Sequence, residues 1–441
     1  MPKDFLEAVD LLNHTGPGTP LGTLLRRYWV PAMLAKDLPE PWAPPVRVKL
    51  LGESLVAFKD TTGRISMLQE FCAHRRASLF FGRNEGEQSP DGQPGLRCAY
   101  HGWKYDVTGR CIDMPNEPAA SRFKEHVQLT SYPAVERGGV IWTYMGPPEL
   151  MPGLPELEWA VVPDNQRYIS RRLEKTCFTQ AMEGGIDSSH ASFLHADNAL
   201  WAGHGPLVDN SGPNALMNAD TAPRFFIEPT EYGLLIGARR NTPNGQYYWR
   251  ITQWLMPWFQ FIPTGGTNGT ISGHAWVPID DETCWTWSMT YHPDRPLTQS
   301  ELDQCTFGHG IHTRLLPGSE LPAQNEDNDY LIDRVMQKHM LSISGIDGVG
   351  AQDQAMQESM GPNFDPTQEQ LGSSDSAIIA ARRRLIAETR ALESGAATEP
   401  SNLDPRLHRV RSAAAVLTQD ESWIEATADQ RRAVTRFYAE T

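Results

Sequence analysis

The chain has 441 residues, of which 40% are hydrophobic and 21% are charged, and its formal net charge is −15 at pH 7. This length exceeds what one hydrophobic core usually serves, so two domains are expected. The acidic balance argues against a nucleic-acid partner, because no run of basic residues offsets it.

The start of the chain resembles no secretory leader, because Met1–Asp4 leads straight into an amphipathic stretch without a basic and then apolar segment. No apolar run approaches the roughly 18 residues that a membrane span needs. Six cysteines in so long a chain do not indicate a disulfide framework. We therefore expect a cytoplasmic protein that does not cross a membrane.

The N-terminal third predicts an arm followed by an all-β domain. Apolar residues at helical spacing predict a helical arm over residues 1–26, with a turn at Gly16–Gly18. From residue 27 to 150, short β-branched and aromatic runs are broken by turn residues, and they predict strands such as 46–50, 54–58 and 140–144. Residues 83–95 are rich in Gly, Pro, Gln and Asp, which predicts an exposed hairpin.

The remaining two thirds, residues 151–441, predict an α+β domain in which an antiparallel sheet packs against helices. A proline-rich stretch marks its start. The expected helices are about 174–196, 326–340, 353–360, 375–394 and 418–438; the clearest strands are 247–255 and 274–278, and residues 394–400 are typical of a linker.

Two short loops in the first domain each offer one thiol and one imidazole, Cys72-x-His74 and Cys98-x-x-His101. Two thiolates suit one iron of a [2Fe–2S] pair and two imidazoles suit the other, which is the Rieske arrangement. A structural zinc ion accepts the same four ligands, so the spacing alone leaves both metals open. The other cysteines are predicted to be small buried hydrophobes.

A second cluster of metal-binding residue types follows in the second domain. His190 and His195, with carboxylates upstream, offer most of a two-histidine, one-carboxylate site for Fe(II). Five residues of regular helix would separate the two side chains by about 140°, so the helix must end, kink or bulge between them. The third ligand must come from far along the chain. We choose Asp353, with Asp347 and Glu358 as rivals; the alternative for the pair is two ordinary histidines.

The residues around both sites resemble one known family. Cys72-Ala73-His74-Arg75-Arg76 and Cys98-Ala99-Tyr100-His101-Gly102-Trp103-Lys104-Tyr105 resemble the Rieske segment of ring-hydroxylating oxygenase α subunits. Asp187-x-x-His190-x-x-x-x-His195 resembles their mononuclear iron motif, and residues 352–362 resemble the phthalate-4,5-dioxygenase branch, whose carboxylate ligand lies where Asp353 does. The resemblance covers about Arg26 to Leu392. One departure is that Ala73 and Arg76 stand where many distant relatives carry Pro and Gly.

The resemblance implies an all-β Rieske [2Fe–2S] domain over residues 27–150 and a catalytic α+β domain of helix-grip type over 151–441. It implies a cluster held by both thiol–imidazole loops and a mononuclear iron held by His190, His195 and Asp353. Asp187 would link an iron-site histidine to the cluster ligand His101 of a neighbouring subunit, in a homotrimer or stacked trimers. The simpler alternative is that Asp187 only orients one ligand. In the bridging role, Asp187→Asn leaves both metals loaded while electrons fail to pass.

The implied activity is that of an oxygenase component in aromatic hydrocarbon catabolism. With O₂ and electrons from a separate flavin and iron–sulfur reductase, it would cis-dihydroxylate an aromatic carboxylate of the phthalate type. A separate reductase is needed because the chain has neither a G-x-G-x-x-G string nor a ferredoxin-type cysteine spacing. The alternatives are monooxygenation, including hydroxylation, O-demethylation or ether cleavage of an aromatic acid, and an electron carrier with a decayed second domain.

A substrate carboxylate needs a basic anchor, and arginine pairs with carboxylates through two hydrogen bonds. Arg250 lies among aromatic residues of the predicted pocket sheet and is our preferred anchor. Arg224, Arg239 and Arg240 are the other candidates, and each of the four could instead cover a sheet edge or pair with a surface acid.

Overall fold

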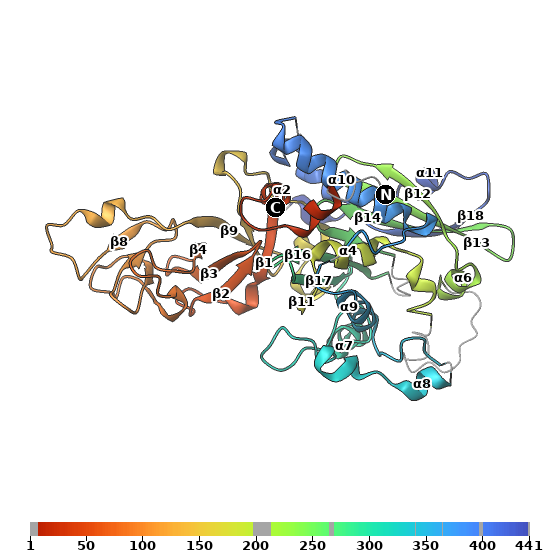
Figure 1. Cartoon of the computed structure of the whole chain (residues 1–441), viewed down its shortest axis with the longest axis horizontal. Coiled ribbons are helices and arrows are strands. Elements are labelled where there is room, and N and C mark those ends of the chain that lie inside the picture. Colours follow the sequence, from red (N-terminus) through yellow and green to blue (C-terminus); the bar gives the residue numbers. More distant parts are fainter. Residues whose placement is uncertain are drawn as a thin grey trace. The chain divides into compact units, whose positions relative to one another are not determined.

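The computed structural model describes residues 8–196, 213–263, 269–339, 341–363, 365–396 and 400–439. These residues form two compact units. The smaller unit contains the described residues of 15–152 and 399–401, and the larger one those of 1–14, 153–398 and 402–441. Figure 1 shows the elements of both units, each of which has its own sheets.

The smaller unit is built on two antiparallel sheets, which confirms the all-β prediction. The first has the strand order β1 (Trp29–Leu34), β10 (Val140–Tyr144), β9 (Ser131–Arg137), β4 (Ile65–Gln69), β3 (Glu53–Lys59) and β2 (Val46–Leu50). The second has the order β5 (Arg83–Glu85), β6 (Gly95–Arg97), β7 (Lys104–Tyr105) and β8 (Cys111–Asp113).

The hairpin predicted over residues 83–95 is present, since β5 pairs with β6 on either side of it. It is more than an exposed excursion. Its tip folds over the side chain of Lys104, whose Nζ lies 2.7 Å from Asp91 Oδ1 and 3.2 Å from Glu85 Oε2. Lys104 is fully buried. A buried ammonium group is tolerated only when it is paired, so the hairpin supplies the charges that this strand needs.

The larger unit is built on one eight-stranded sheet, and its α+β architecture is as predicted. The strand order is β11 (Arg167–Glu174), β17 (Cys284–Tyr291), β16 (Ile271–Pro278), β15 (Phe259–Phe261), β14 (Tyr247–Leu255), β13 (Gly233–Asn241) and β12 (Arg224–Pro229), with β18 (Ala413–Leu417) pairing with β14. All of these pairs are antiparallel.

The two faces of this sheet differ in polarity. Residues directly opposite each other on antiparallel strands point to the same face. Arg172 opposes Thr286, and His274 opposes both Ser288 and Gln260, so these polar side chains share a face. The residues between them point to the other face of the sheet. These residues are apolar and buried, and they include Ala275, Val277, Trp287 and Met289.

Three helices, α4 (Phe178–Ile186), α9 (Val349–Ser359) and α10 (Ser376–Glu393), follow one another across the sheet. Helix α10 contacts β12, β13 and α4, and α4 contacts β16 and α9. Figure 1 shows α10 at the β12–β14 end. The structure further describes α2 (Pro20–Leu25) in the smaller unit, and in the larger unit α3 (Glu158–Val161), α6 (Pro213–Ala219), α7 (Gln299–Phe307), α8 (Arg334–Lys338) and α11 (Trp423–Ala426).

Two glycines allow α4 to lie close to its neighbours. A Cβ atom on Gly184 would lie 2.2 Å from Gln357 Nε2 of α9, and one on Gly185 would lie 2.2 Å from Gln260 Oε1 and 2.6 Å from Trp276 Cη2 of the sheet. Because the Gln260 and Trp276 side chains share a face with His274, α4 covers the polar face of the sheet.

Several helix predictions were wrong in extent. The helix predicted over 174–196 covers only 178–186. Residue 174 ends the strand 167–174, and a 3-10 turn follows the helix at His190–Ser192. The segment 326–340 is a 3-10 helix (Glu326–Leu331) and α8, with Met340 outside the described residues. In 418–438, only α11, whose Trp423 ring stacks 5.2 Å from that of Trp249, and a 3-10 turn starting at Arg436 are helical.

The N-terminal helix also ends earlier than predicted. A 3-10 turn ends at Asn13, the chain turns at Gly16–Gly18, and α2 starts afresh with Thr19 as its cap. Residues 1–7 of the predicted helix and residues 397–399 of the predicted linker lie outside the described residues. Within the described part of the chain, no helix is both long and apolar enough to cross a membrane.

Candidate metal centres

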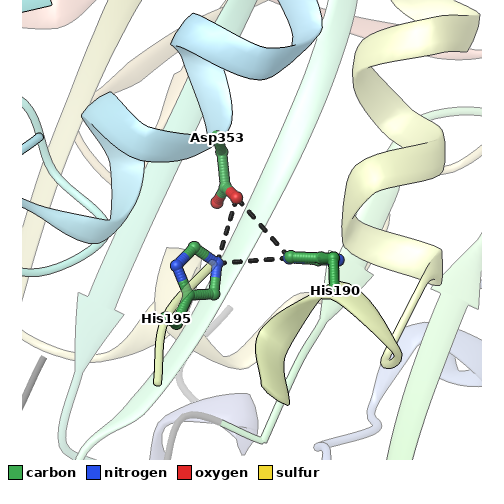
Figure 2. Close-up of side chains that lie close together, drawn as sticks. All are labelled: His190, His195 and Asp353. Carbon is green, nitrogen blue, oxygen red and sulfur yellow. Dashed lines mark hydrogen bonds and ion pairs between the residues drawn. The ribbon is translucent and has the colours of Figure 1, made fainter. Parts of the chain in front are cut away.

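Three side chains from distant parts of the sequence meet at one point in the larger unit. His190 Nε2 lies 3.2 Å from His195 Nε2 and 3.5 Å from Asp353 Oδ1, and His195 Nε2 lies 3.0 Å from Asp353 Oδ1. Figure 2 shows Asp353 reaching from its helix toward the two imidazoles. Two histidines and one carboxylate that leave the rest of the coordination sphere free match the donor set of non-heme Fe(II) sites.

The local chain path explains how two histidines five residues apart face the same point. Helix α4 ends at Ile186, and the carboxylate of Asp187 accepts hydrogen bonds from the backbone N–H groups of Ser189 at 2.6 Å and His190 at 3.1 Å. These bonds start a new 3-10 turn at His190. The regular helix therefore ends before the first histidine, as the 3.6-residue period requires.

Asp353 comes from the second turn of α9, which begins after Gly348, whose φ is +87°. The rival acids lie elsewhere. The carboxylate of Asp347 lies 3.6 Å from His309 Nδ1, and Glu358 accepts hydrogen bonds from the backbone N–H of Lys175 and the hydroxyl of Tyr330. Neither rival belongs to the convergent group.

The outer nitrogen of each imidazole faces an acceptor. His190 Nδ1 lies 3.2 Å from Asp187 Oδ2, and His195 Nδ1 lies 2.8 Å from Gln352 Oε1. Gln352 is itself oriented, since its amide nitrogen donates to the Ile346 carbonyl at 2.9 Å. Each Nδ1 therefore carries the hydrogen, and each Nε2 lone pair points into the site. Sequence reasoning missed Gln352, although it directly precedes Asp353.

The electrostatics of this site favour a cation. Burial opposes protonation of His190, but Asp187 and Asp353 outweigh it and raise the pKa of His190 to about 10. Burial would likewise favour the neutral Asp353, yet the two histidines hold the pKa of this carboxyl well below its usual range. The carboxylates thus demand a positive charge, which a divalent metal supplies in place of a proton. The donor set and this charge both fit Fe(II).

In the smaller unit, the two thiol–imidazole loops have the same backbone pattern. The N–H of Cys72 donates to the Ala77 carbonyl and that of Arg76 to the Cys72 carbonyl, at 2.9 Å each. The N–H of Cys98 donates to the Trp103 carbonyl at 2.8 Å and that of Gly102 to the Cys98 carbonyl at 3.1 Å. The cysteine and histidine of each loop are therefore carried by the same type of backbone turn.

The fifth residue of each loop has a left-handed backbone, with φ +63° at Arg76 and +79° at Gly102. Glycine adopts this conformation freely, whereas other L-residues lose roughly 1–2 kcal/mol. Arg76, the departure from distant relatives noted in the sequence, offsets part of this cost through its guanidinium, which lies 4.7 Å from the centre of the Phe71 ring.

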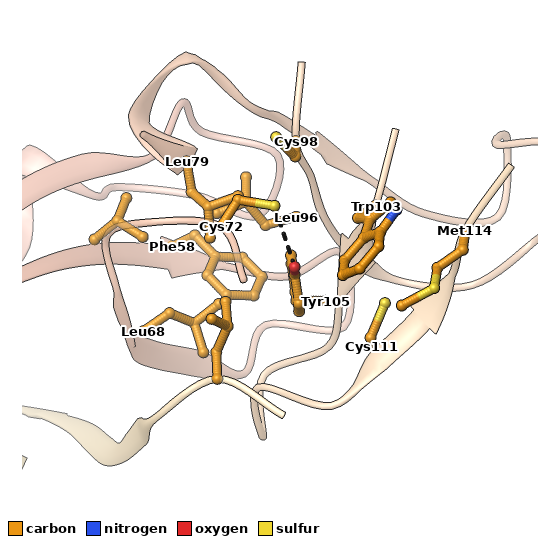
Figure 3. Packing of buried hydrophobic residues seen from close by; sticks show 12 residues of the cluster. Phe58, Leu68, Cys72, Leu79, Leu96, Cys98, Trp103, Tyr105, Cys111 and Met114 are labelled. Carbon is orange, nitrogen blue, oxygen red and sulfur yellow. Dashed lines mark hydrogen bonds between the residues drawn. The ribbon is translucent and has the colours of Figure 1, made fainter. Parts of the chain in front are cut away.

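The four side chains of these loops form two pairs. The thiols of Cys72 and Cys98 are buried in the hydrophobic core of the unit, where Figure 3 shows the Cys72 sulfur facing the Tyr105 hydroxyl, 3.2 Å away. The rings of His74 and His101 are only partly buried and lie 4.4 Å apart, centre to centre. The thiols thus form one pair and the imidazoles another, and a Rieske cluster binds one iron through two thiolates and the other iron through two imidazoles.

Two further observations fit a cluster. His74 Nδ1 is buried and has no hydrogen-bond partner, a cost that a metal ion would remove. Hydrogen bonds from Cys72 and from the backbone N–H groups of Tyr100 and His101 lower the pKa of Cys98 to about 6 against the effect of burial. Among the described residues, no three of these four donors lie within 4.8 Å of one another.

A cavity of about 280 Å³ opens onto the three convergent residues, and Asp187 also lines it. Of the four arginines proposed from the sequence, Arg250 lines this cavity. Arg240 instead donates to the Ser188 carbonyl at 2.5 Å and so holds the loop after α4. Arg239 stacks on Tyr247 at 3.9 Å, and Arg224 is exposed on the edge strand β12.

Sequence reasoning missed Arg172, His274 and His312, which also line the cavity. Arg172 stands next to Arg171, and nothing in the sequence tells which of the two faces inward before the strand register is known. The four cysteines outside the loops, Cys111, Cys177, Cys284 and Cys305, are buried and unbridged, as predicted.

Two family models together match most of the chain. Residues 28–133 match the model described as "Rieske [2Fe-2S] domain", and residues 143–439 match the model described as "LigXa C-terminal domain like".

Curated relatives match over nearly their whole length. The 3-chlorobenzoate-3,4-dioxygenase oxygenase subunit of Comamonas testosteroni is 37% identical, covering 88% of this chain and 89% of the relative. The phthalate 4,5-dioxygenase oxygenase subunit of Pseudomonas putida is 34% identical, covering 94% and 92%. Among solved structures, the NdmA QL mutant of Pseudomonas putida CBB5 with theobromine superposes with a TM-score of 0.56 at 20% identity, over 92% of this chain and 100% of that one, and it shows a shared fold.

Proposed function

The chain belongs to the family of Rieske-type aromatic-ring-hydroxylating oxygenase subunits, and from this premise we propose that it is the oxygenase component that cis-dihydroxylates an aromatic carboxylate of the phthalate type. The observation that carries the proposal is the convergence of His190, His195 and Asp353 at a cavity that also contains arginine side chains. The reaction takes O₂ and electrons from a separate flavin and iron–sulfur reductase.

The cofactors are a Rieske [2Fe–2S] cluster and a mononuclear iron. We assign Cys72, His74, Cys98 and His101 to the cluster, within a domain of residues 27–150. We assign the three convergent residues to the iron, within a domain of residues 151–441. When bound, the cluster stores single electrons and the ferrous ion activates dioxygen.

Arg250 is our proposed anchor for the substrate carboxylate. It lines the cavity, and its guanidinium makes no hydrogen bond or ion pair with any described residue. A partly buried cation without a counter-charge favours an anionic ligand. The names of the relatives, a chlorobenzoate and a phthalate dioxygenase, agree with an aromatic acid.

Asp187 is proposed as the residue through which electrons reach the iron from the cluster of a neighbouring subunit. It contacts His190 and lines the cavity, so it lies beside the iron ligands. This role of Asp187 requires an oligomer, which we propose is a homotrimer or stacked trimers. In a closed head-to-tail ring, the cluster of one chain lies against the iron of the next. The six unbridged cysteines agree with a cytoplasmic location.

A single-turnover experiment tests the proposed reaction. Chemically reduced protein is mixed with O₂ and a panel of phthalate isomers, methoxybenzoates and phenoxybenzoates, and the products are identified. We expect a cis-diol from a phthalate-type acid. Phenols with an aldehyde would instead assign monooxygenation, and about two iron atoms per chain rather than about three would leave only an electron carrier.

A further inference from the structure

One end of the cavity is polar, and the proposed function does not use it. It is formed by alternate residues of β11, β16 and β17, among them Arg172 and His274, together with His312 from the segment after α7. The ring nitrogens of His312 are both occupied: Nδ1 lies 2.7 Å from Ser170 Oγ and Nε2 lies 3.0 Å from Thr290 Oγ1. His312 is therefore part of the wall.

His274 differs from His312, because only one of its two ring nitrogens has a hydrogen-bond partner among the described residues. Its Nδ1 lies 3.1 Å from the Trp287 carbonyl oxygen, which can only accept, so Nδ1 carries the hydrogen. Burial and the nearby charge of Arg172 lower the pKa of His274 to about 4, so the ring is neutral at pH 7. Nε2 then holds a lone pair, and no described residue donates to it.

Arg172 supplies hydrogen-bond donors, whereas His274 supplies an acceptor. Arg172 is 3% exposed, and its Nη2 lies 3.3 Å from Glu174 Oε2, whereas Nε and Nη1 have no partner among the described residues. Arg172 and His274 line the same cavity, and the strand register puts both side chains on one face of the sheet, on the two strands that flank β17. This end of the cavity therefore offers an N–H donor on a guanidinium beside a bare imidazole acceptor.

A hydroxyl group satisfies both partners at once, since it accepts a hydrogen bond through its lone pairs and donates one through its hydrogen. A second carboxylate suits Arg172 but has no hydrogen to give, so its oxygen would face the lone pair of His274. We propose that Arg172 and His274 form a subsite for a phenolic hydroxyl, so that the substrate is a hydroxylated aromatic acid. This rests on the proposed function, in which the carboxylate of the same ring binds at Arg250.

The test compares ligands that differ only in the hydroxyl. Isothermal titration calorimetry of the iron-loaded, oxidised protein is performed under anaerobic conditions with 3- and 4-hydroxybenzoate and with the methylbenzoates of the same shape. We expect one hydroxy acid to bind roughly ten-fold or more tightly than its methyl counterpart, because a methyl group leaves buried polar groups unpaired.

Three variants test whether His274 causes the preference for the hydroxy acid over the methyl acid. In His274→Asn, the amide nitrogen replaces Nδ1 against the Trp287 carbonyl and the acceptor at Nε2 is lost, so the preference should fall to within about two-fold. His274→Gln places an amide oxygen near the position of Nε2 and should restore most of it. His312→Asn removes a neighbouring buried imidazole whose nitrogens already have partners, and it should keep the wild-type ratio.

Equal binding of the hydroxy and methyl acids by the wild-type protein would overturn the subsite, as would a preference that survives His274→Asn. Tighter binding of phthalate than of either hydroxybenzoate, lost in Arg172→Gln, would also overturn it by assigning Arg172 to a second carboxylate. If the wild-type protein binds none of these aromatic acids, the proposed function itself is wrong. The two failures are thus distinguishable.

Discussion

The direction of the two iron-site imidazoles depends on residues that bind no metal. Asp187 holds Nδ1 of His190, and the amide of Gln352 holds Nδ1 of His195. One outer partner is thus a carboxylate and the other is neutral. Both leave an Nε2 lone pair directed at the carboxylate of Asp353.

We predict that Gln352→Leu lowers the affinity for Fe(II) about 10- to 100-fold, because the His195 ring loses the acceptor that fixes its tautomer and orientation. Gln352→Glu keeps an acceptor and should retain iron better. The measurement is iron retained in competition with a chelator, with the cluster absorbance of the same sample as an internal reference.

Gln354→Leu provides the control for this prediction. Gln354 is also buried on α9, but its side chain donates to Glu358 at 3.0 Å instead of orienting an iron-site histidine. If both leucine variants lose iron equally, Gln352 acts through helix stability, and the orienting role is wrong.

The residue types that bind metal could be predicted from the sequence, whereas the residues that surround them could not. Spacing alone left two ordinary histidines open for His190 and His195, and the resemblance to the oxygenase family is what pointed to an iron site there. Gln352, Arg172 and His274 are ordinary residues until strand register and helix phase bring them to the cavity. The role of Gln352, for example, depends on its contact with His195, which lies 157 residues away in the sequence.

At the scale of elements, the placement of α4 decides where the iron-site loop begins. Gly185 lies so close to the sheet that a methyl group would meet Gln260 and Trp276. Further along, Arg240 from β13 of the same sheet donates to the Ser188 carbonyl and holds the loop at this point. The loop that carries Asp187 and His190 is therefore held at both ends.

We predict that Gly185→Ala lowers the free energy of unfolding by roughly 1–3 kcal/mol, the usual cost of overpacking, and lowers iron content with it. Denaturant unfolding and iron analysis measure the two effects. Gly16→Ala is the matched control, since a Cβ there meets nothing within 4 Å. Unchanged stability in Gly185→Ala would show that α4 can shift freely and that the glycine is not needed for close packing.

Periodicity located the elements more reliably than it found their ends. The strands at 46–50, 140–144 and 247–255 have the predicted bounds, because alternating or aromatic runs end at turn residues. The helices over 174–196 and 418–438 were predicted too long, since tertiary contacts overrode local propensity. In the second case, β18 directly precedes the segment, and Trp423 of the short helix α11 packs against Trp249 of the sheet.

At the scale of the whole molecule, the two metal centres belong to different compact units. In the proposed ring, a chain's cluster serves the iron of its neighbour rather than its own. This arrangement can be tested by mixing chains that each lack one centre.

We predict that Cys72→Ser, which removes a cluster ligand, and His195→Ala, which removes an iron ligand, are each inactive alone but active when co-expressed. In randomly mixed rings, a chain with an intact cluster precedes a chain with an intact iron site at about a quarter of the junctions, so about a quarter of wild-type turnover should return. Turnover of aromatic acid per chain, relative to wild type, measures it. No recovery in verified mixed oligomers would mean that electrons stay within one chain.

The two-residue alternation along β16 and β17 has a consequence for how this scaffold diversifies. Ser272, His274 and Thr290 face the cavity, while the residues between them, such as Ala275 and Met289, build the apolar side of the sheet. The cavity-facing positions that do not pack against α4, such as Ser272 and Thr290, can therefore vary without disturbing the apolar layer of the sheet. New specificities can arise by exchanging a few alternate side chains, and directed evolution would begin most profitably at those positions.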